Sequence, residues 1–170
     1  MRGLQMTVMA GLLAAGCAAT PKIVHDKSGA TSSLEDLKGR AVVLTFWANN
    51  CTPCLQQMPL VMDSVARYGN QVVLLTVFAY EKPGHKLDGW LQNQPQWFQD
   101  QICWANEDFL LKYDRTVLPK TYVYGRNGHL VETFDGVIDA QRAPIFHASL
   151  LRALAAVRDY PEPNAASVVK

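Results

Sequence analysis

Two residues separate Cys51 from Cys54, in the order Cys51-Thr52-Pro53-Cys54. Two thiols at this spacing can bond to each other, supply half of a metal site, or exchange disulfides with another molecule. Only the ionised thiolate attacks a disulfide, so the chemistry depends on the elements that hold the pair.

The residues on either side of the cysteines predict a strand and a helix. The preceding run, 41–47, is continuously apolar, which is typical of a strand buried on both faces. After Cys54, apolar residues recur at helical spacing: Leu55, Met58, Val61 or Met62, Val65 and Tyr68. Cys51 is therefore predicted near a helix N-terminus, where free backbone N–H groups and the helix dipole favour a thiolate.

A metal site and a permanent structural disulfide are the alternatives. A closed zinc site needs four ligands, but the sequence has no second C-x-x-C, and its remaining candidate ligands are scattered: His25, His85, Cys103, His129 and His147. A permanent bond this local closes a very small loop and brings little entropic benefit. Redox use of the pair is therefore the prediction, with no metal.

Length and composition predict one globular domain. The chain has 170 residues, of which 49% are hydrophobic and 18% charged, so a full core is expected. The net charge is +1 and no basic run occurs, so nucleic acid is not an expected partner. We expect a monomer.

The first residues have the pattern of a secretory signal. A positive start at Arg2 precedes a mostly apolar stretch, 4–15, that is too short to span a bilayer. The sequence 13–17 resembles a bacterial lipoprotein signal, which implies cleavage after residue 16 and lipidation of Cys17. The expected organisation is a signal peptide at 1–16, a tether at 17–30, a domain at 31–160 and a disordered tail at 161–170. An ordinary signal peptide or an uncleaved anchor is the alternative.

The rest of the chain alternates strands and helices. A second apolar run, 71–78, implies a parallel crossover from the first, and Asn127-Gly128 predicts a hairpin between 121–124 and 129–134. Further expected elements are a helix at 86–94, a short strand at 102–104, a helix from an Asn106 cap to Tyr113, a final helix around 146–157 and an edge strand at Ile23-Val24. This order predicts an α/β fold, a three-layer α/β/α sandwich with a mixed central sheet.

Phe46-Trp47-Ala48 before the C-x-P-C motif resembles the thioredoxin superfamily. The closer resemblance is to the TlpA/ResA-like, membrane-tethered thiol-disulfide oxidoreductases of bacteria. The segment 113–124, with Leu118-Pro119, is similar to their cis-proline segment, and the inserted helix and strand around 84–104 fit that subgroup. The resemblance implies a thioredoxin-like fold over most of the chain.

The resemblance also assigns roles to individual residues. It implies that Pro119 is cis, and that the backbone of Leu118 faces Cys51 and binds an extended client segment. It implies that Glu81 handles the proton of Cys54; a solvated loop glutamate is the equal alternative. No cofactor is implied.

Several residues depart from the family pattern. Asn50 stands where tryptophan is frequent, Gln57 where glutamate is frequent, and Lys120 where threonine is common. Thr45 occupies the place of an acid in thioredoxin itself. Lys120 is expected to be solvated. Cys103 is expected to be buried. Trp90, Trp97 and Trp104 are expected to pack in the core or in the insertion and not to form a ligand cage.

The predicted function is an extracytoplasmic, membrane-anchored thiol-disulfide oxidoreductase that reduces protein disulfides. Its expected partners are a disulfide-containing client, with an apocytochrome in cytochrome c maturation as one candidate, and a membrane electron donor that reduces thiols. The alternatives are a dithiol oxidase of the same fold and a non-catalytic module that binds a client or a soft metal. A peroxidase is a weaker alternative, because a peroxidatic cysteine normally needs a different local motif.

Overall fold

A computed structural model describes residues 23–25, 31–80 and 85–156. The strands are β1 (Ile23–His25), β2 (Thr31–Ser32), β3 (Ala41–Trp47), β4 (Val72–Phe78), β5 (Ile102–Ala105), β6 (Lys120–Tyr124) and β7 (Leu130–Asp135). The α-helices are α1 (Thr52–Ala66), α2 (His85–Gln92), α3 (Gln96–Gln99), α4 (Glu107–Leu110) and α5 (Ala143–Ala155), and two short 3₁₀ helices are η1 (Glu35–Leu37) and η2 (Gly69–Gln71).

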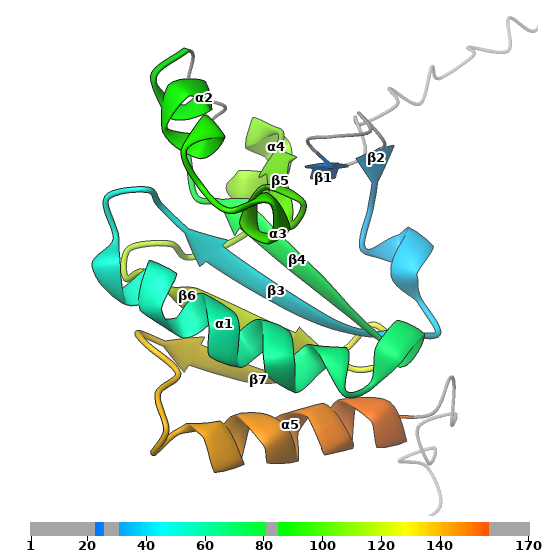
Figure 1. Ribbon diagram of the computed structural model, residues 1–170. Helices are drawn as coiled ribbons and strands as arrows, with labels where there is room; N and C mark the ends of the chain where they lie inside the picture. Colours follow the sequence, from blue (N-terminus) through cyan, green and yellow to red (C-terminus); the bar gives the residue numbers. More distant parts are fainter. Residues whose placement is uncertain (1–22, 26–30, 81–84, 157–170) are drawn as a thin grey trace, which may run out of the picture.

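The described strands form one mixed sheet in the order β2-β1-β5-β4-β3-β6-β7 (Figure 1). β3 pairs in parallel with β4 and antiparallel with β6, and every residue of β3 is buried. A strand covered on both faces needs side chains that are apolar in both directions, which explains the continuous run in the sequence. The predicted mixed sheet and parallel crossover are confirmed.

Helices cover both faces of the sheet. α1 and α5 lie side by side on one face (Figure 1), where residues such as Val43, Val61 and Phe146 share one buried cluster. On the opposite face, α4 and η1 cover a second cluster that includes Val42, Phe46 and Phe109. Successive residues of β3 point to opposite faces, so the single run serves both layers. The predicted three-layer sandwich is confirmed.

A third buried cluster lies where the carboxyl ends of β3 and β4 meet the start of α1. α2 and β5, the predicted inserted helix and strand, contribute Leu87 and Trp104 to it, and the short helix α3 between them contributes Phe98. Trp47 and Cys54 belong to the same cluster, so the insertion covers the end of the sheet that carries the C-x-x-C motif.

Some boundaries differ from the predictions. α4 ends at Leu110, whereas the apolar spacing suggested a helix to Tyr113, although the predicted cap is present: Phe109 N donates to Asn106 Oδ1 at 3.1 Å. α3 was not expected. β1 lies within the predicted tether and pairs with β5 and β2, so β2 forms the edge of the sheet.

Candidate active site

Cys51 and Cys54 form a disulfide at the first turn of α1, as the sequence predicts. Cys51 is the N-cap residue, and its Sγ accepts a hydrogen bond from Cys54 N at 3.2 Å, in the place of a serine or aspartate side chain. Leu55 N donates to Cys51 O at 3.2 Å. Once the disulfide is reduced, the same N–H group and the helix dipole favour a thiolate at Cys51 over a thiol.

The two sulfurs differ in exposure. Cys51 is partly exposed, whereas Cys54 is completely buried in the third cluster. The Trp47 ring lies 5.2 Å from the Phe78 ring and 5.3 Å from the Phe98 ring, so aromatic groups wall this interior. Solvent can therefore reach Cys51 but not Cys54.

The peptide bond between Leu118 and Pro119 is cis, which confirms the prediction from the family resemblance. Leu118 packs against the same cluster as Cys51. Pro119 is buried, and its carbonyl accepts a hydrogen bond from Gly136 N at 2.9 Å. Gly136 has a φ of +77°, a conformation that favours glycine.

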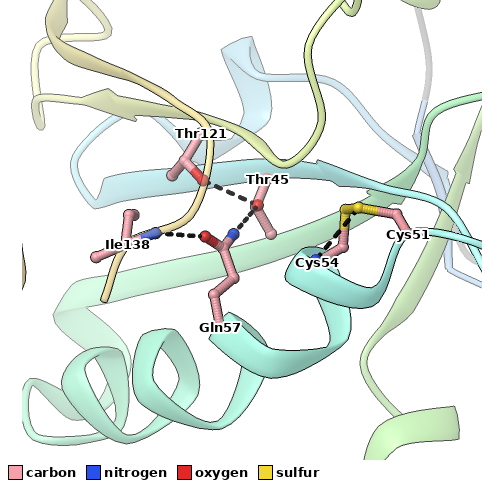
Figure 2. The surroundings of a disulfide bond; sticks show 6 residues. All are labelled: Thr45, Cys51, Cys54, Gln57, Thr121 and Ile138. Atoms are coloured by element: carbon pink, nitrogen blue, oxygen red, sulfur yellow. Dashed lines mark hydrogen bonds between the residues drawn. A yellow bond between two sulfur atoms is a disulfide. The ribbon is translucent and has the colours of Figure 1, made fainter. Parts of the chain in front are cut away.

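A chain of uncharged polar side chains lies beside the disulfide (Figure 2). Gln57 Nε2 donates to Thr45 Oγ1 at 3.2 Å, and Thr45 Oγ1 lies 2.9 Å from Thr121 Oγ1. Gln57 Oε1 accepts from Ile138 N at 2.9 Å. We call these four residues the neutral network. Two of them, Thr45 and Gln57, stand at the positions where the family resemblance points to acids in other members. Sequence reasoning missed Thr121 and Ile138: only the pairing of β3 with β6 brings the Thr121 hydroxyl beside Thr45, and Ile138 contributes a backbone N–H, which every residue type except proline carries.

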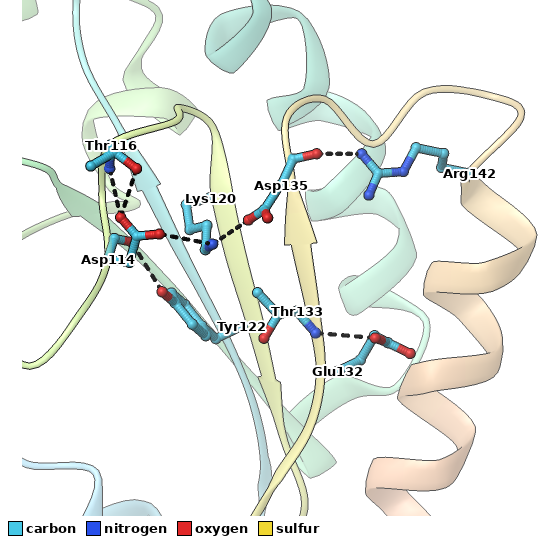
Figure 3. A network of polar contacts seen from close by, with 8 residues as sticks. All are labelled: Asp114, Thr116, Lys120, Tyr122, Glu132, Thr133, Asp135 and Arg142. Carbon is cyan, nitrogen blue, oxygen red and sulfur yellow. Dashed lines mark hydrogen bonds and ion pairs between the residues drawn. The ribbon is translucent and has the colours of Figure 1, made fainter.

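Lys120 is buried, so the expectation of a solvated lysine is wrong. Its side chain is 8% exposed and forms ion pairs with Asp114, at 3.5 Å, and with Asp135 (Figure 3). The hydrogen bond that Lys120 Nζ donates to the Asp135 carboxylate is the main reason that the pKa of Lys120 is raised. Lys120 lies on the face opposite Thr121, since neighbouring strand residues point in opposite directions. We call Asp114, Lys120 and Asp135 the charged network.

Aromatic side chains surround the charged network on that face. The ring of Tyr113 lies 5.1 Å from that of Phe46 and 5.0 Å from that of Tyr122. Burial raises the pKa of Tyr113 above its ordinary value. Tyr122 Oη donates to Asp114 O at 3.0 Å, which fixes the segment leading to Leu118.

Apolar side chains are exposed on the rim near the disulfide. Tyr80 is 55% exposed and its ring lies 5.7 Å from that of Phe78, while Val117 is 50% exposed. Arg115 Nη1 donates to Ala79 O, which joins the segment before Leu118 to the residues that follow β4. Arg115 Nε has no hydrogen-bond partner within the described residues. Trp97 is 46% exposed, and its ring lies 5.7 Å from that of Phe98, which agrees with packing in the insertion, whereas Trp104 and Cys103 are buried as expected.

Several sequence predictions fall on residues that the structure does not describe. Glu81, Cys17, the signal peptide and the tail lie outside the described residues, and their predicted roles stay predictions. Within the described ranges, no group of three or more His, Cys, Asp or Glu side chains is placed to hold a metal ion. None of the helices described is long and apolar enough to cross a membrane.

Comparison with known proteins identifies the family of this chain and its relatives. The family model described as "AhpC/TSA family" matches residues 15–133, well over half of the chain. The chain belongs to the AhpC/TSA family. Among its curated relatives, this AhpC/TSA chain is 27% identical over 121 residues to "Thiol-disulfide oxidoreductase ResA" of Oceanobacillus iheyensis, covering 71% of this chain and 62% of that protein. ResA of Bacillus subtilis is 23% identical over 116 residues, covering 68% and 64%.

The predicted resemblance to ResA-like proteins is therefore confirmed, although the chain spans less than two thirds of their length. A shorter match, 42% identical over 50 residues, joins 29% of this AhpC/TSA chain to 29% of the "Thioredoxin-like protein YneN" of Bacillus subtilis.

Solved structures confirm the thioredoxin-like fold. A putative thiol:disulfide interchange protein DsbE from Chlorobium tepidum has a TM-score of 0.62 at 22% identity and covers 79% of this chain and 94% of its own. The exposed lipoprotein thioredoxin Etrx1 from Streptococcus pneumoniae has a TM-score of 0.59 at 24% identity, covering 76% and 98%.

Proposed function

We propose that this protein is a thiol-disulfide oxidoreductase that reduces disulfides in client proteins outside the cytoplasm. One observation carries the proposal: a disulfide joins a partly exposed Cys51, which caps α1, to a completely buried Cys54. A structural disulfide does not need one sulfur at a helix N-terminus within reach of solvent. A nucleophile needs both features.

The reaction begins with both cysteines reduced. The Cys51 thiolate attacks one sulfur of the client disulfide, which forms a mixed disulfide and releases the other client sulfur as a thiolate that takes up a proton. Cys54 then loses its proton and attacks Cys51 Sγ, and the second client sulfur leaves. Two electrons pass to the client, and the Cys51–Cys54 bond seen in the structure is the product.

A dithiol partner must restore the reduced pair by the same exchange in reverse. We propose a membrane-bound electron donor for this step, with Cys17 as the lipid anchor that holds the domain near it. The support is by analogy, from the ResA relatives and from the solved structure described as an exposed lipoprotein. Labelling with palmitate of the native chain, but not of a Cys17→Ala variant, tests the anchor.

The leading experiment traps the mixed disulfide. In a Cys54→Ala variant the second attack is impossible, so the client stays joined to Cys51 and is identified by mass spectrometry after non-reducing electrophoresis. The matched control is Cys103→Ala in the same background, which leaves the adducts unchanged because Cys103 is buried on the opposite face. If Cys54→Ala forms no adduct that reducing agent releases, the catalytic proposal is wrong.

The oxidase of the same fold is the second candidate, because the structure holds the pair as a disulfide, the form that an oxidase donates. The reduction potential of the pair separates the two directions. Equilibration with glutathione is expected to give a reduction potential of about −270 mV for the reductase, whereas a potential of about −120 mV indicates the oxidase.

A further inference from the structure

Gln57 brings an amide into the interior one turn after Cys54. Gln57 is 2% exposed, and the nitrogen and the oxygen of its side-chain amide each form a hydrogen bond. The backbone N–H of Ile138 can only donate, so the atom facing it must be the amide oxygen, which leaves the amide NH₂ for Thr45. The orientation of Gln57 is therefore fixed by its surroundings.

The first of these bonds leads to the segment that is expected to receive the client. Ile138 N donates to Gln57 Oε1 at 2.9 Å, and two residues earlier Gly136 N donates to Pro119 O, also at 2.9 Å. One short loop thus holds α1 by one N–H group and Pro119 by another. Arg142 Nη1 steadies the same loop by donating to Asp135 O and Val137 O.

The second bond reaches the same strand from inside the sheet. Gln57 Nε2 donates to Thr45 Oγ1, which pairs with Thr121 Oγ1 (Figure 2). Thr121 lies two residues after Pro119 on β6. Gln57 is therefore linked to Pro119 through the loop 136–138 and to Thr121 through Thr45. Every group in these hydrogen bonds is uncharged.

We propose that Gln57 is a positioning residue, which holds the helix carrying the cysteines at a fixed separation from the Leu118-Pro119 segment. The inference rests on the proposed function. A client protein must contact both the sulfur of Cys51 and the backbone of that segment at once, whereas a small disulfide needs the sulfur alone. Gln57 therefore controls exchange with protein disulfides and leaves the intrinsic reactivity of the cysteines unchanged.

The test compares two neighbouring glutamines on α1. Gln57→Met keeps the length of the side chain and removes both of its hydrogen bonds, while Gln56→Met makes the same change at an exposed position. Rates are measured with insulin as the protein disulfide and with 5,5′-dithiobis(2-nitrobenzoate) as the small one. For Gln57→Met we expect kcat/KM for insulin to fall by between about 10- and 100-fold, the loss that a displacement of about 1 Å produces. The rate with the small disulfide stays within about twofold of the native value, and Gln56→Met matches the native protein in both assays.

Amide hydrogen exchange reports the coupling directly. In Gln57→Met, the N–H groups of Ile138 and Gly136 are expected to exchange faster, while amides in the centre of β3 keep their protection. Gln57→Glu restores an acceptor for Ile138 N, and the Thr45 hydroxyl can turn to donate to the other carboxylate oxygen. Burial raises the pKa of an introduced carboxyl, so the insulin rate of Gln57→Glu recovers toward the native rate as the pH rises above that pKa.

Three outcomes overturn the positioning role. They are an equal loss with both disulfides in Gln57→Met, an unchanged insulin rate in that variant, and faster exchange spread evenly over the sheet. A native protein that reacts with neither disulfide contradicts the proposed function itself, so the two failures are distinguishable. If Gln57→Met does not fold, the contrast between Gln57→Glu and the native protein across pH decides the question.

Discussion

Two polar networks lie on opposite sides of the same strand. Thr121 and Lys120 are neighbours on β6, yet Thr121 joins the neutral network on the α1 face and Lys120 joins the charged network on the other. Both networks also reach the end of β7, the charged one at Asp135, the last residue of that strand, and the neutral one at Ile138 in the loop that follows. The neutral network is completely enclosed, whereas the carboxylates of the charged network are more than half exposed.

The difference shows how charge is distributed around the sulfurs. Beside the disulfide, the described side chains of the neutral network carry no charge, so the N-terminus of α1 supplies the local field that favours a thiolate at Cys51. The buried cation of Lys120 lies behind the sheet, where two solvated carboxylates neutralise it. Charge therefore stabilises the fold on one face, and neutral hydrogen bonds set the geometry on the other.

Removing both carboxylates of the charged network is expected to have the largest effect. Asp114→Asn with Asp135→Asn leaves Lys120 buried without a counter-charge, which should cost about 3 kcal/mol of unfolding free energy. Urea unfolding measures the loss. Adding Lys120→Met to the pair should recover most of it, because no buried charge then remains. A loss below about 1 kcal/mol in the double variant contradicts a desolvated lysine.

Breaking the neutral network should cost less and should not respond to salt. Thr45→Val keeps the shape of the side chain but leaves Gln57 Nε2 and Thr121 Oγ1 without their Thr45 partner, which should lower the unfolding free energy by about 1–3 kcal/mol. The same urea experiment in 1 M NaCl, a concentration chosen to screen charges, should give the same difference. A difference that shrinks with salt shows that charge, not hydrogen bonding, governs this site.

Alkaline pH should lower the stability by a smaller amount, and part of that loss should come from the charged network. The raised pKa of Lys120, caused first by its hydrogen bond with Asp135, means that its contribution is complete below its ordinary value of 10.5 and is lost as the pH rises through the folded value. The pKa of Tyr113 is raised by burial, so the unfolded chain releases that proton first and stability also falls above 10.0. Urea midpoints followed from neutral to alkaline pH should fall less steeply in Lys120→Met than in the native protein. Equal slopes show that the tyrosines alone produce the fall.

Removing an exposed ion pair is expected to have the smallest effect on the unfolding free energy. Arg152 Nη2 lies 2.9 Å from Glu132 Oε2, and these side chains are 52% and 36% exposed. Glu132→Gln should change the unfolding free energy by less than about 0.5 kcal/mol, because both groups stay hydrated. Thermal unfolding in low salt is the most sensitive measurement, and a loss as large as that of the Asp114/Asp135 double variant contradicts the ranking.

The elements that position the cysteines could be predicted from local patterns. The continuous apolar run predicts β3, and apolar residues at helical spacing predict α1. Each pattern can be recognised because it is contained within a short stretch of sequence. α3 has four residues after Pro95, which is too short for any periodicity to show. α4 was predicted too long, because Leu111 and Tyr113 continue the apolar pattern beyond the last helical turn.

The cysteine pair of the site could also be predicted, but its support could not. Cys51, Cys54 and Pro119 carry chemistry in their own residue types. The burial of Lys120 depends on Asp135, which only the pairing of β6 with β7 brings opposite it. The partner of Gln57 is a backbone N–H 81 residues away, and no property of that position in the sequence indicates the contact.

The position of Cys103 on β5 has a practical consequence for the redox pair. Its side chain is 3% exposed and belongs to the cluster on the face away from Cys54, so the central sheet stands between the two sulfurs. Scrambling to a Cys54–Cys103 bond would require β3, β4 and β5 to separate. In the proposed reaction, the sheet therefore keeps the Cys103 thiol from capturing the disulfide.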